Sequence, residues 1–193
     1  MRNFWPKTFK QWVTLITGIV SLFLYVATQE GWLNQAGQVA QENQPGLYTV
    51  TRFSDGDTIV VSMMGKDETI RFIGVDTPET HKPNTPVQCF GPAASAYTKN
   101  LIGDNKVRLE SDSLTTNRDR YDRLLRYVYL TDGTLVNEDL IKNGFGFYYP
   151  YFAFTKAGQF DEAQKSAQAD NKGLWGACSP IKKGEGYISN IAG

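Results

Sequence analysis

Two short segments of the chain carry the residue types that phosphate chemistry requires. The first begins with the sequence Asp-Gly-Asp-Thr around Asp57 and continues through Arg71 to Asp76 and Glu79. The second is Asp-Arg-Tyr-Asp-Arg, which ends at Arg123. Carboxylate oxygens are ligands for hard cations such as Ca²⁺, and guanidinium groups bind phosphate in bidentate fashion. The combination suits a hard metal ion held beside a phosphodiester.

The carboxylates of the first segment lie at places where the chain turns. Asp57 follows a tight Asp-Gly turn, and Asp76 and Glu79 lie in a loop that leaves a strand-like run, because Pro78 has no N–H with which to continue a ladder. If the strands are neighbours, Asp57 and Asp76 converge, and a loop carbonyl such as that of Thr77 would complete a set of oxygen ligands for Ca²⁺. The Asp-Gly dipeptide by itself indicates only a turn.

The arginines are placed where a charge needs a partner. Arg71 lies between Ile70 and Phe72 in an apolar run, where a charge is costly unless it is paired or faces a cleft. Arg123 closes a charged patch. When each arginine is considered by itself, Arg71 is accounted for by a structural salt bridge and Arg123 by a position in a solvated loop.

The elements expected to position these residues are short strands followed by helices. Runs rich in Val, Ile, Thr and Phe predict strands over residues 48–53, 58–62, 68–75, 106–111 and 124–130. Helical spacing predicts helices over 92–102, over 136–143, and from Thr155 as N-cap to 172. This order favours an α+β fold, a five-stranded, partly open β-barrel of the OB type with three helices.

The N-terminus predicts a membrane segment. Arg2, Lys7 and Lys10 precede an uncharged, largely apolar run over 11–29. Its length approaches that of a transmembrane helix, and the basic flank predicts a translocated C-terminal part. A cleaved signal peptide is the alternative. We therefore expect a domain outside the cytoplasm, either anchored in the membrane or secreted after cleavage.

The remaining organisation follows from composition. Residues 1–29 form the anchor or signal segment, 30–46 a polar linker, 47–180 the folded domain and 181–193 a C-terminal tail. The only two cysteines, Cys89 and Cys178, suit one disulfide in an oxidising compartment, and two buried free thiols are the alternative. The formal net charge of zero argues against tight nonspecific duplex binding but permits a local basic patch.

The joint pattern resembles the staphylococcal nuclease (thermonuclease) family. Asp-Gly-Asp-Thr, a strand, Arg-x-x-x-Val-Asp-Thr-Pro-Glu and later Asp-Arg-Tyr-x-Arg occur in that order. The resemblance covers about residues 47–175, with support from Phe-Gly-Pro-Ala-Ala-Ser-Ala at 90–96, Val-Asn-Glu-Asp-Leu at 136–140 and Lys-Gly-Leu-Trp at 172–175.

The resemblance implies a Ca²⁺-dependent phosphodiesterase or endonuclease that hydrolyses DNA and RNA phosphodiesters and leaves 3′-phosphates. It leaves open whether DNA or RNA is preferred and whether cleavage is internal or from the ends. In such an enzyme Asp57, Asp76 and the Thr77 carbonyl would bind the metal. Glu79 would act as the general base or orient the water. Three further roles are implied: phosphate binding by Arg71 and Arg123, contact with a terminal phosphate by Arg120 and Tyr121, and base stacking by Tyr149 and Tyr151.

Several alternatives stay open. The aromatic rings of Tyr149 and Tyr151 would, in the simpler interpretation, pack between the last two helices. Asp122 stands where a small or neutral residue is usual, and it would either pair with Arg123 or repel phosphate. We expect a monomer that prefers single-stranded DNA or RNA. The main alternative is a nonenzymatic OB-type module that binds single strands or a peptide, and the third is a membrane-tethered domain with a vestigial site.

Overall fold

The computed structural model describes residues 7–29, 46–80 and 86–191 of the 193-residue chain. The predicted linker therefore lies, except for its last residue, outside the described residues. The chain divides into two compact units, Met1–Gln44 and Pro45–Gly193.

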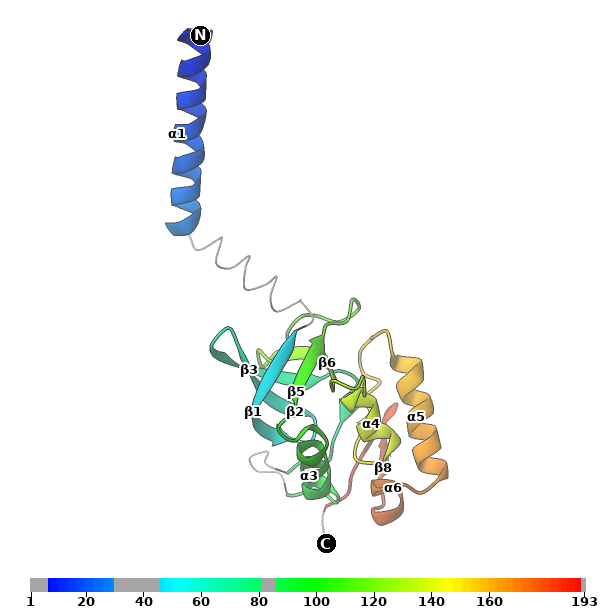
Figure 1. Ribbon diagram of the computed structural model, residues 1–193. Helices are drawn as coiled ribbons and strands as arrows, with labels where there is room; N and C mark the ends of the chain where they lie inside the picture. The colour runs from blue at the N-terminus through cyan, green and yellow to red at the C-terminus, as the bar shows by residue number, and fades with distance from the viewer. Residues whose placement is uncertain (1–6, 30–45, 81–85, 192–193) are drawn as a thin grey trace. The chain divides into compact units, whose positions relative to one another are not determined.

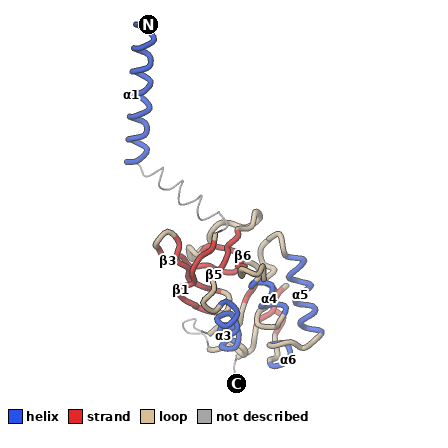
Figure 2. Tube along the Cα trace, viewed as in Figure 1, coloured by secondary structure: helices blue, strands red, loops and turns tan. Residues whose placement is uncertain are grey.

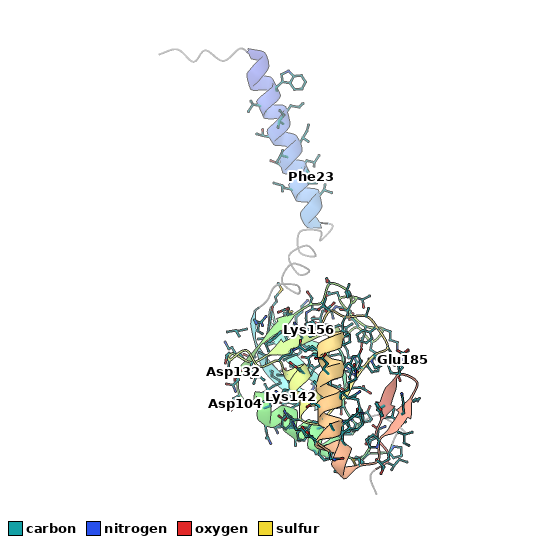
Figure 3. All side chains as sticks on the ribbon, turned by 90° about the vertical axis from the view of Figure 1, so that its right-hand side faces the viewer. Phe23, Asp104, Asp132, Lys142, Lys156 and Glu185 are labelled. Carbon is teal, nitrogen blue, oxygen red and sulfur yellow. A yellow bond between two sulfur atoms is a disulfide. The ribbon has the colours of Figure 1, made fainter. Side chains whose placement is uncertain are left out.

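In the first unit the described residues form a single helix, α1 (Lys7–Gln29). Its large apolar side chains are exposed from Trp12 to Val26, and Phe23, for example, is 64% exposed (Figure 3). Among the residues that the structure describes, no helix is both long enough and apolar enough to cross a membrane. The predicted transmembrane segment is thus not supported by the structure.

The second unit is built on a closed five-stranded barrel with the strand order β1-β2-β3-β6-β5 (Figure 1). It is closed, rather than partly open as the sequence predicted. Neighbouring strands are antiparallel except β3 and β6, which run parallel. The strands are β1 (Leu47–Asp55), β2 (Thr58–Met63), β3 (Lys66–Phe72), β5 (Lys106–Glu110) and β6 (Leu124–Tyr129).

Apolar side chains from all five strands fill the barrel, because alternate residues of a strand face its interior. Ile59, Ile70 and Leu124 are fully buried members of this core. The predicted strand over 68–75 divides at Gly74, which has a φ of 72° and is followed by β4 (Val75–Asp76). β4 pairs with β7 (Phe147–Tyr148) outside the barrel.

Among the described residues, four helices accompany the barrel: α3 (Gly91–Ile102), α4 (Val136–Lys142), α5 (Ala157–Ala169) and the one-turn α6 (Leu174–Ala177). The three predicted helices are present, with α6 in addition. α4 and α5 lie side by side (Figure 2). The buried Asn137 joins α4 to the barrel, since its amide accepts a bond from Val128 N–H and donates one to the Ile73 carbonyl, at 2.8 and 2.9 Å.

The predicted N-cap of the last long helix is wrong. Lys156, not Thr155, occupies the N-cap position, and no side chain caps the helix. The Thr155 hydroxyl instead donates to Asp112, a buried carboxylate that also accepts from the Tyr127 hydroxyl. A buried carboxylate needs several donors, so this tertiary partner replaces the local cap. The helix also ends at Ala169, earlier than predicted.

The region predicted as a C-terminal tail contains a hairpin of β8 (Ile181–Lys183) and β9 (Gly186–Ile188). It is held by an aromatic contact: the ring of Tyr187 lies 5.0 Å from that of Trp175 and 6.3 Å from that of Phe147. The segment therefore packs onto the domain.

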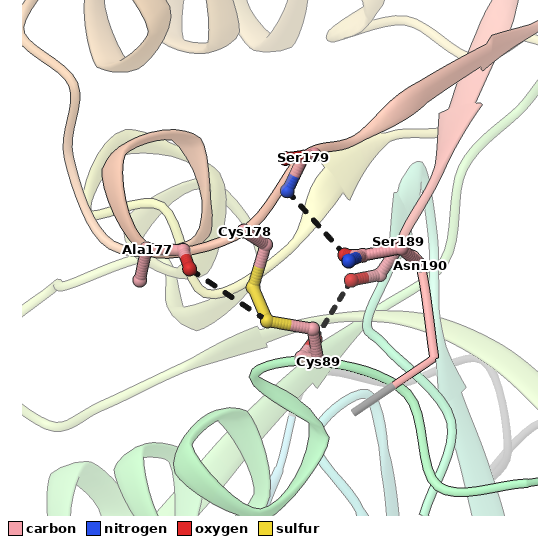
Figure 4. The surroundings of a disulfide bond; sticks show 6 residues. All are labelled: Cys89, Ala177, Cys178, Ser179, Ser189 and Asn190. Carbon is pink, nitrogen blue, oxygen red and sulfur yellow. Dashed lines mark hydrogen bonds between the residues drawn. A yellow bond between two sulfur atoms is a disulfide. The ribbon is translucent and has the colours of Figure 1, made fainter. Parts of the chain in front are cut away.

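The predicted disulfide is confirmed. Cys89 and Cys178 are bonded, with their Cα atoms 6.0 Å apart, and join the residues before α3 to the residue after α6 (Figure 4). The structure holds no free cysteine within the described residues, which excludes the alternative of two buried thiols.

Removing this disulfide should destabilise the domain. It connects residues 89 positions apart, so it restricts the unfolded chain strongly, and typical losses are about 2–4 kcal/mol in the free energy of unfolding. We expect the double variant Cys89→Ser/Cys178→Ser to show this loss in urea denaturation without reductant. Wild-type protein in reductant should show the same loss, and a double variant as stable as the oxidised wild type would contradict the prediction.

Candidate active site

A cleft of about 960 Å³ opens beside the barrel. Residues from β2, β3, β4 and the loops around residues 114–123 and 149–153 line it. It is lined by every predicted metal, catalytic and substrate residue except Tyr151: Asp57, Arg71, Asp76, Thr77, Glu79, Arg120, Tyr121, Arg123 and Tyr149. Tertiary structure therefore brings together the two segments that the sequence singled out.

Asp57 lies directly before β2 and accepts three hydrogen bonds. It is only 6% exposed, and Thr77 donates to its Oδ2 from both N–H (2.8 Å) and Oγ1 (3.0 Å). Its Oδ1 accepts from Thr58 Oγ1 at 2.9 Å. The preceding Gly56 is required here, because a Cβ at that position would lie 2.9 Å from the Thr77 side chain. The Asp-Gly turn thus serves both the fold and the site.

Arg71 lies between the two carboxylates. Its Nη2 is 2.8 Å from Asp76 Oδ1 and 3.4 Å from Asp57 Oδ2, while Nη1 donates to the Val75 carbonyl at 2.6 Å. Burial alone would lower the pKa of Arg71, but the two carboxylates raise it above its ordinary value. The guanidinium is therefore firmly charged, and it forms a salt bridge while also lining the cleft.

The carboxylate oxygens of Asp57 and Asp76 are ligands of the kind that a hard cation prefers. Asp57 and Asp76 approach the same arginine nitrogen, so two carboxylates face one region, and the Asp76 side chain is 40% exposed. Within the described residues, no group of three or more His, Cys, Asp or Glu side chains is arranged to hold a metal ion. Ca²⁺ accepts carbonyl and water oxygens besides carboxylates. Two carboxylates with the Thr77 carbonyl are thus compatible with Ca²⁺.

Glu79 lies half-buried in the loop after β4. Its Oε1 accepts from the N–H of Thr80 at 3.1 Å, and its own N–H donates to Gln88 Oε1 at 2.8 Å. The start of α3 packs closely beneath this loop, because a Cβ on Gly91 would meet the Glu79 carbonyl at 2.9 Å. The carboxylate therefore sits on a backbone that is held from two sides.

Asp119 lines the cleft, and sequence reasoning assigned it no role. Its Oδ2 accepts from Arg123 Nε at 2.8 Å and Nη2 at 2.7 Å. Its Oδ1 accepts from the backbone N–H groups of Tyr121 and Arg123, at 2.9 and 3.0 Å. The spacing of four residues in Asp-Arg-Tyr-x-Arg was the available signal. Asp119 orients Arg123 much as Asp76 orients Arg71.

The pKa of Asp119 reflects this role. Burial would raise it, but the hydrogen bonds from Arg123 and Tyr121 outweigh burial and place the pKa below the ordinary value of 3.8. A lowered folded-state pKa means that the charged carboxylate stabilises the fold above that ordinary value. The contribution is lost as the pH falls through the lowered pKa.

Replacing Asp119 with Asn should lower kcat by about 10-fold. The amide can still accept one bond, but it no longer offers a charged partner that orients the guanidinium of Arg123. The Asp119→Asn variant should have a lower free energy of unfolding than wild type at pH 7, and this difference should shrink as the pH falls below 3.8. Asp122→Asn is the matched control, because that side chain is 89% exposed. Equal kcat for Asp119→Asn and wild type would contradict the prediction.

The segment around Tyr121 forms the outer edge of the cleft. Tyr121 is 64% exposed, Arg120 Nη2 donates to its hydroxyl at 2.7 Å, and the guanidinium carbon of Arg123 lies 5.4 Å from its ring centroid. Asp122 has a φ of 64°, a left-handed conformation that glycine adopts most readily. Its carboxylate lies 3.7 Å from Arg118 Nε, so Asp122 forms an ion pair with Arg118.

The two tyrosines predicted to stack on bases, Tyr149 and Tyr151, lie in different surroundings. Tyr149 lines the cleft, and burial together with the charge of Asp76 raises the pKa of its hydroxyl. Tyr151 does not line the cleft; it is 51% exposed, and its hydroxyl donates to the Lys183 carbonyl in the C-terminal hairpin. The two rings meet at 4.8 Å between centroids. Of these two tyrosines, Tyr149 is the one placed to contact a molecule in the cleft.

Comparisons with known proteins agree with this geometry. The sequence profile of the family described as staphylococcal nuclease homologue matches residues 69–177. A thermonuclease of Staphylococcus hyicus is 41% identical over 166 residues, which cover 84% of this chain and 94% of the relative. Endonuclease YncB of Bacillus subtilis is 41% identical over 160 residues, covering 81% of this chain and 72% of the relative. The chain belongs to the staphylococcal nuclease family.

Proposed function

We propose that the protein is a nuclease that hydrolyses phosphodiester bonds of DNA and RNA. The observation that carries the proposal is the pair of arginines, Arg71 and Arg123, each held by a carboxylate in the same cleft as Glu79. Relatives named thermonuclease and endonuclease support it.

The cleft residues match the needs of phosphodiester hydrolysis. Negative charge grows on the phosphoryl oxygens in the transition state, and two preorganised guanidinium groups stabilise it. Among the carboxylates that line the cleft, we assign Glu79 as the one that accepts a proton from the attacking water. Asp57, Asp76 and the Thr77 carbonyl would hold Ca²⁺, which supplies Lewis-acid polarisation of a phosphoryl oxygen when it is bound.

The substrate and product preferences are also part of the proposal. The Tyr149 ring beside the arginines suits an unpaired base, because aromatic faces stack on single-stranded bases without sequence choice. We propose internal cleavage of single strands by a monomer, with the 3′-phosphate products that the family resemblance implies.

We further propose that the domain acts outside the cytoplasm. The disulfide Cys89–Cys178 supports this, since such bonds persist in oxidising compartments. The basic, then apolar N-terminus would direct export, as an anchor or as a cleaved signal. N-terminal sequencing of the mature protein from membrane and medium fractions tests both. Intact, reduced protein confined to the cytoplasm would overturn the proposal.

The decisive experiment follows cleavage of fluorogenic single-stranded DNA and RNA in Ca²⁺ and then in excess chelator. We expect cleavage only with the cation, and Asp76→Asn should raise the Ca²⁺ concentration required for half-maximal rate. End-group analysis of the products should find 3′-phosphates. Binding of the oligonucleotides by folded protein without any turnover would identify a nonenzymatic binding module instead.

A further inference from the structure

The loop that carries Glu79 is bound directly to Gln88. Gln88 Oε1 accepts the Glu79 N–H at 2.8 Å, and the Gln88 N–H donates to the Glu79 carbonyl at 2.9 Å. Both backbone polar groups of Glu79 are therefore satisfied by one residue nine positions away. Two such bonds restrict rotation and translation of the backbone from which the carboxylate projects.

Gln88 is itself anchored to the C-terminal segment. It forms an antiparallel bridge with Ile191, and the next residue, Cys89, donates its N–H to the Asn190 carbonyl at 2.8 Å. Ser189 Oγ donates to the Cys89 carbonyl, also at 2.8 Å. Figure 4 shows Cys89, Ser189 and Asn190 around the disulfide that joins Cys89 to Cys178.

This anchor lies beyond the part of the chain that the family profile matches. That match ends at residue 177, whereas Cys178 and residues 189–191 follow it. The C-terminal segment is therefore linked to Cys89 and Gln88, by the disulfide from Cys178 and by the backbone pairing of residues 189–191. Gln88 is in turn hydrogen-bonded to Glu79. Each step is a covalent or hydrogen bond between described residues.

We propose that Gln88 is a positioning residue for Glu79, and that the disulfide-linked C-terminal segment is the support that holds Gln88 in place. The inference rests on the proposed role of Glu79 in the nuclease. A catalytic carboxylate must be placed within a fraction of an ångström, and a misplacement of about 1 Å costs up to about 10²-fold in rate. The support therefore sets kcat rather than substrate affinity.

The test of Gln88 compares an apolar and an oxygen-bearing replacement. Gln88→Leu removes the acceptor for the Glu79 N–H at similar volume and should lower kcat about 10- to 100-fold with KM changed less than about 2-fold. Gln88→Glu keeps an acceptor at the same reach and should restore most of kcat. Val87→Ala, at a neighbouring side chain that is 41% exposed, is the control. Unchanged kcat in Gln88→Leu, or equal loss in both Gln88 variants, would overturn the proposal.

A double-mutant cycle separates positioning from general damage. If Gln88 acts through Glu79, Gln88→Leu should have little further effect on kcat in a Glu79→Gln background. A full, additive loss in that background would show that Gln88 acts elsewhere and would overturn the proposal. A wild-type protein without nuclease activity would instead refute the proposed function, so the two failures are distinguishable.

Hydrogen exchange of the Glu79 amide gives a readout that requires no activity. Exchange should be faster in Gln88→Leu than in wild type, because the N–H loses its acceptor. It should also be faster in the Cys89→Ser/Cys178→Ser variant, measured well below that variant's melting temperature. An equally protected Glu79 amide in the serine variant would overturn the role assigned to the C-terminal support.

Discussion

Replacing Arg123 with Leu should lower kcat by about 10²–10³-fold, the usual cost of removing one preorganised group that stabilises transition-state charge. The guanidinium is positioned before substrate arrives, because Asp119 binds its Nε and Nη2 at 2.8 and 2.7 Å. It lines the same cleft as Arg71 and Glu79. Steady-state cleavage of a single-stranded oligonucleotide in Ca²⁺ measures the effect.

Arg123→Lys separates charge from geometry. A lysine keeps the positive charge but lacks the planar fork that binds a carboxylate or phosphate in bidentate fashion, so most of the loss should remain. The matched control is Arg108→Leu, which removes an arginine paired with Glu110 at 2.8 Å but outside the residues that line the cleft. A folded Arg123→Leu enzyme with kcat within about 3-fold of wild type would contradict the role assigned to Arg123.

Replacing Glu79 with Gln should lower kcat by about 10²–10³-fold, within the range of general-base catalysis. Glutamine has the same shape and retains an oxygen that can accept from the Thr80 N–H, a bond of 3.1 Å in the wild type. It cannot take a proton from water, so the loss reports chemistry rather than folding. Single-turnover cleavage with saturating enzyme isolates this step from binding.

The control for Glu79 is Glu138→Gln on α4. That carboxylate also makes a hydrogen bond, from Gln159 at 2.7 Å, but it does not line the cleft. Glu79→Gln and Glu138→Gln should both have melting temperatures near that of the wild type. If Glu79→Gln cleaves at the wild-type rate, another group accepts the proton and the proposed mechanism is wrong.

The elements whose pattern is local were readable from the sequence. Runs rich in Val, Ile, Thr and Phe, separated by turn residues, indicated all five barrel strands, and helical spacing indicated α3, α4 and α5. The acidic and arginine residues of the cleft were also recognisable, because their order along the chain resembles a known family. The sequence-based predictions failed where a residue binds a partner that is distant in the chain. Thr155, for example, does not cap the last long helix, because its hydroxyl donates to Asp112.

What the sequence alone determined is the order of strands and helices and the set of charged residues that could act on a phosphodiester. These depend on composition, spacing and neighbours close in the chain. Tertiary structure decided that Asp119 orients Arg123, that Tyr151 lies outside the cleft, and that a C-terminal hairpin is present. It also decided that Gln88 supports Glu79. Each depends on where a hydrogen-bond partner lies after the chain has folded, which no local pattern encodes.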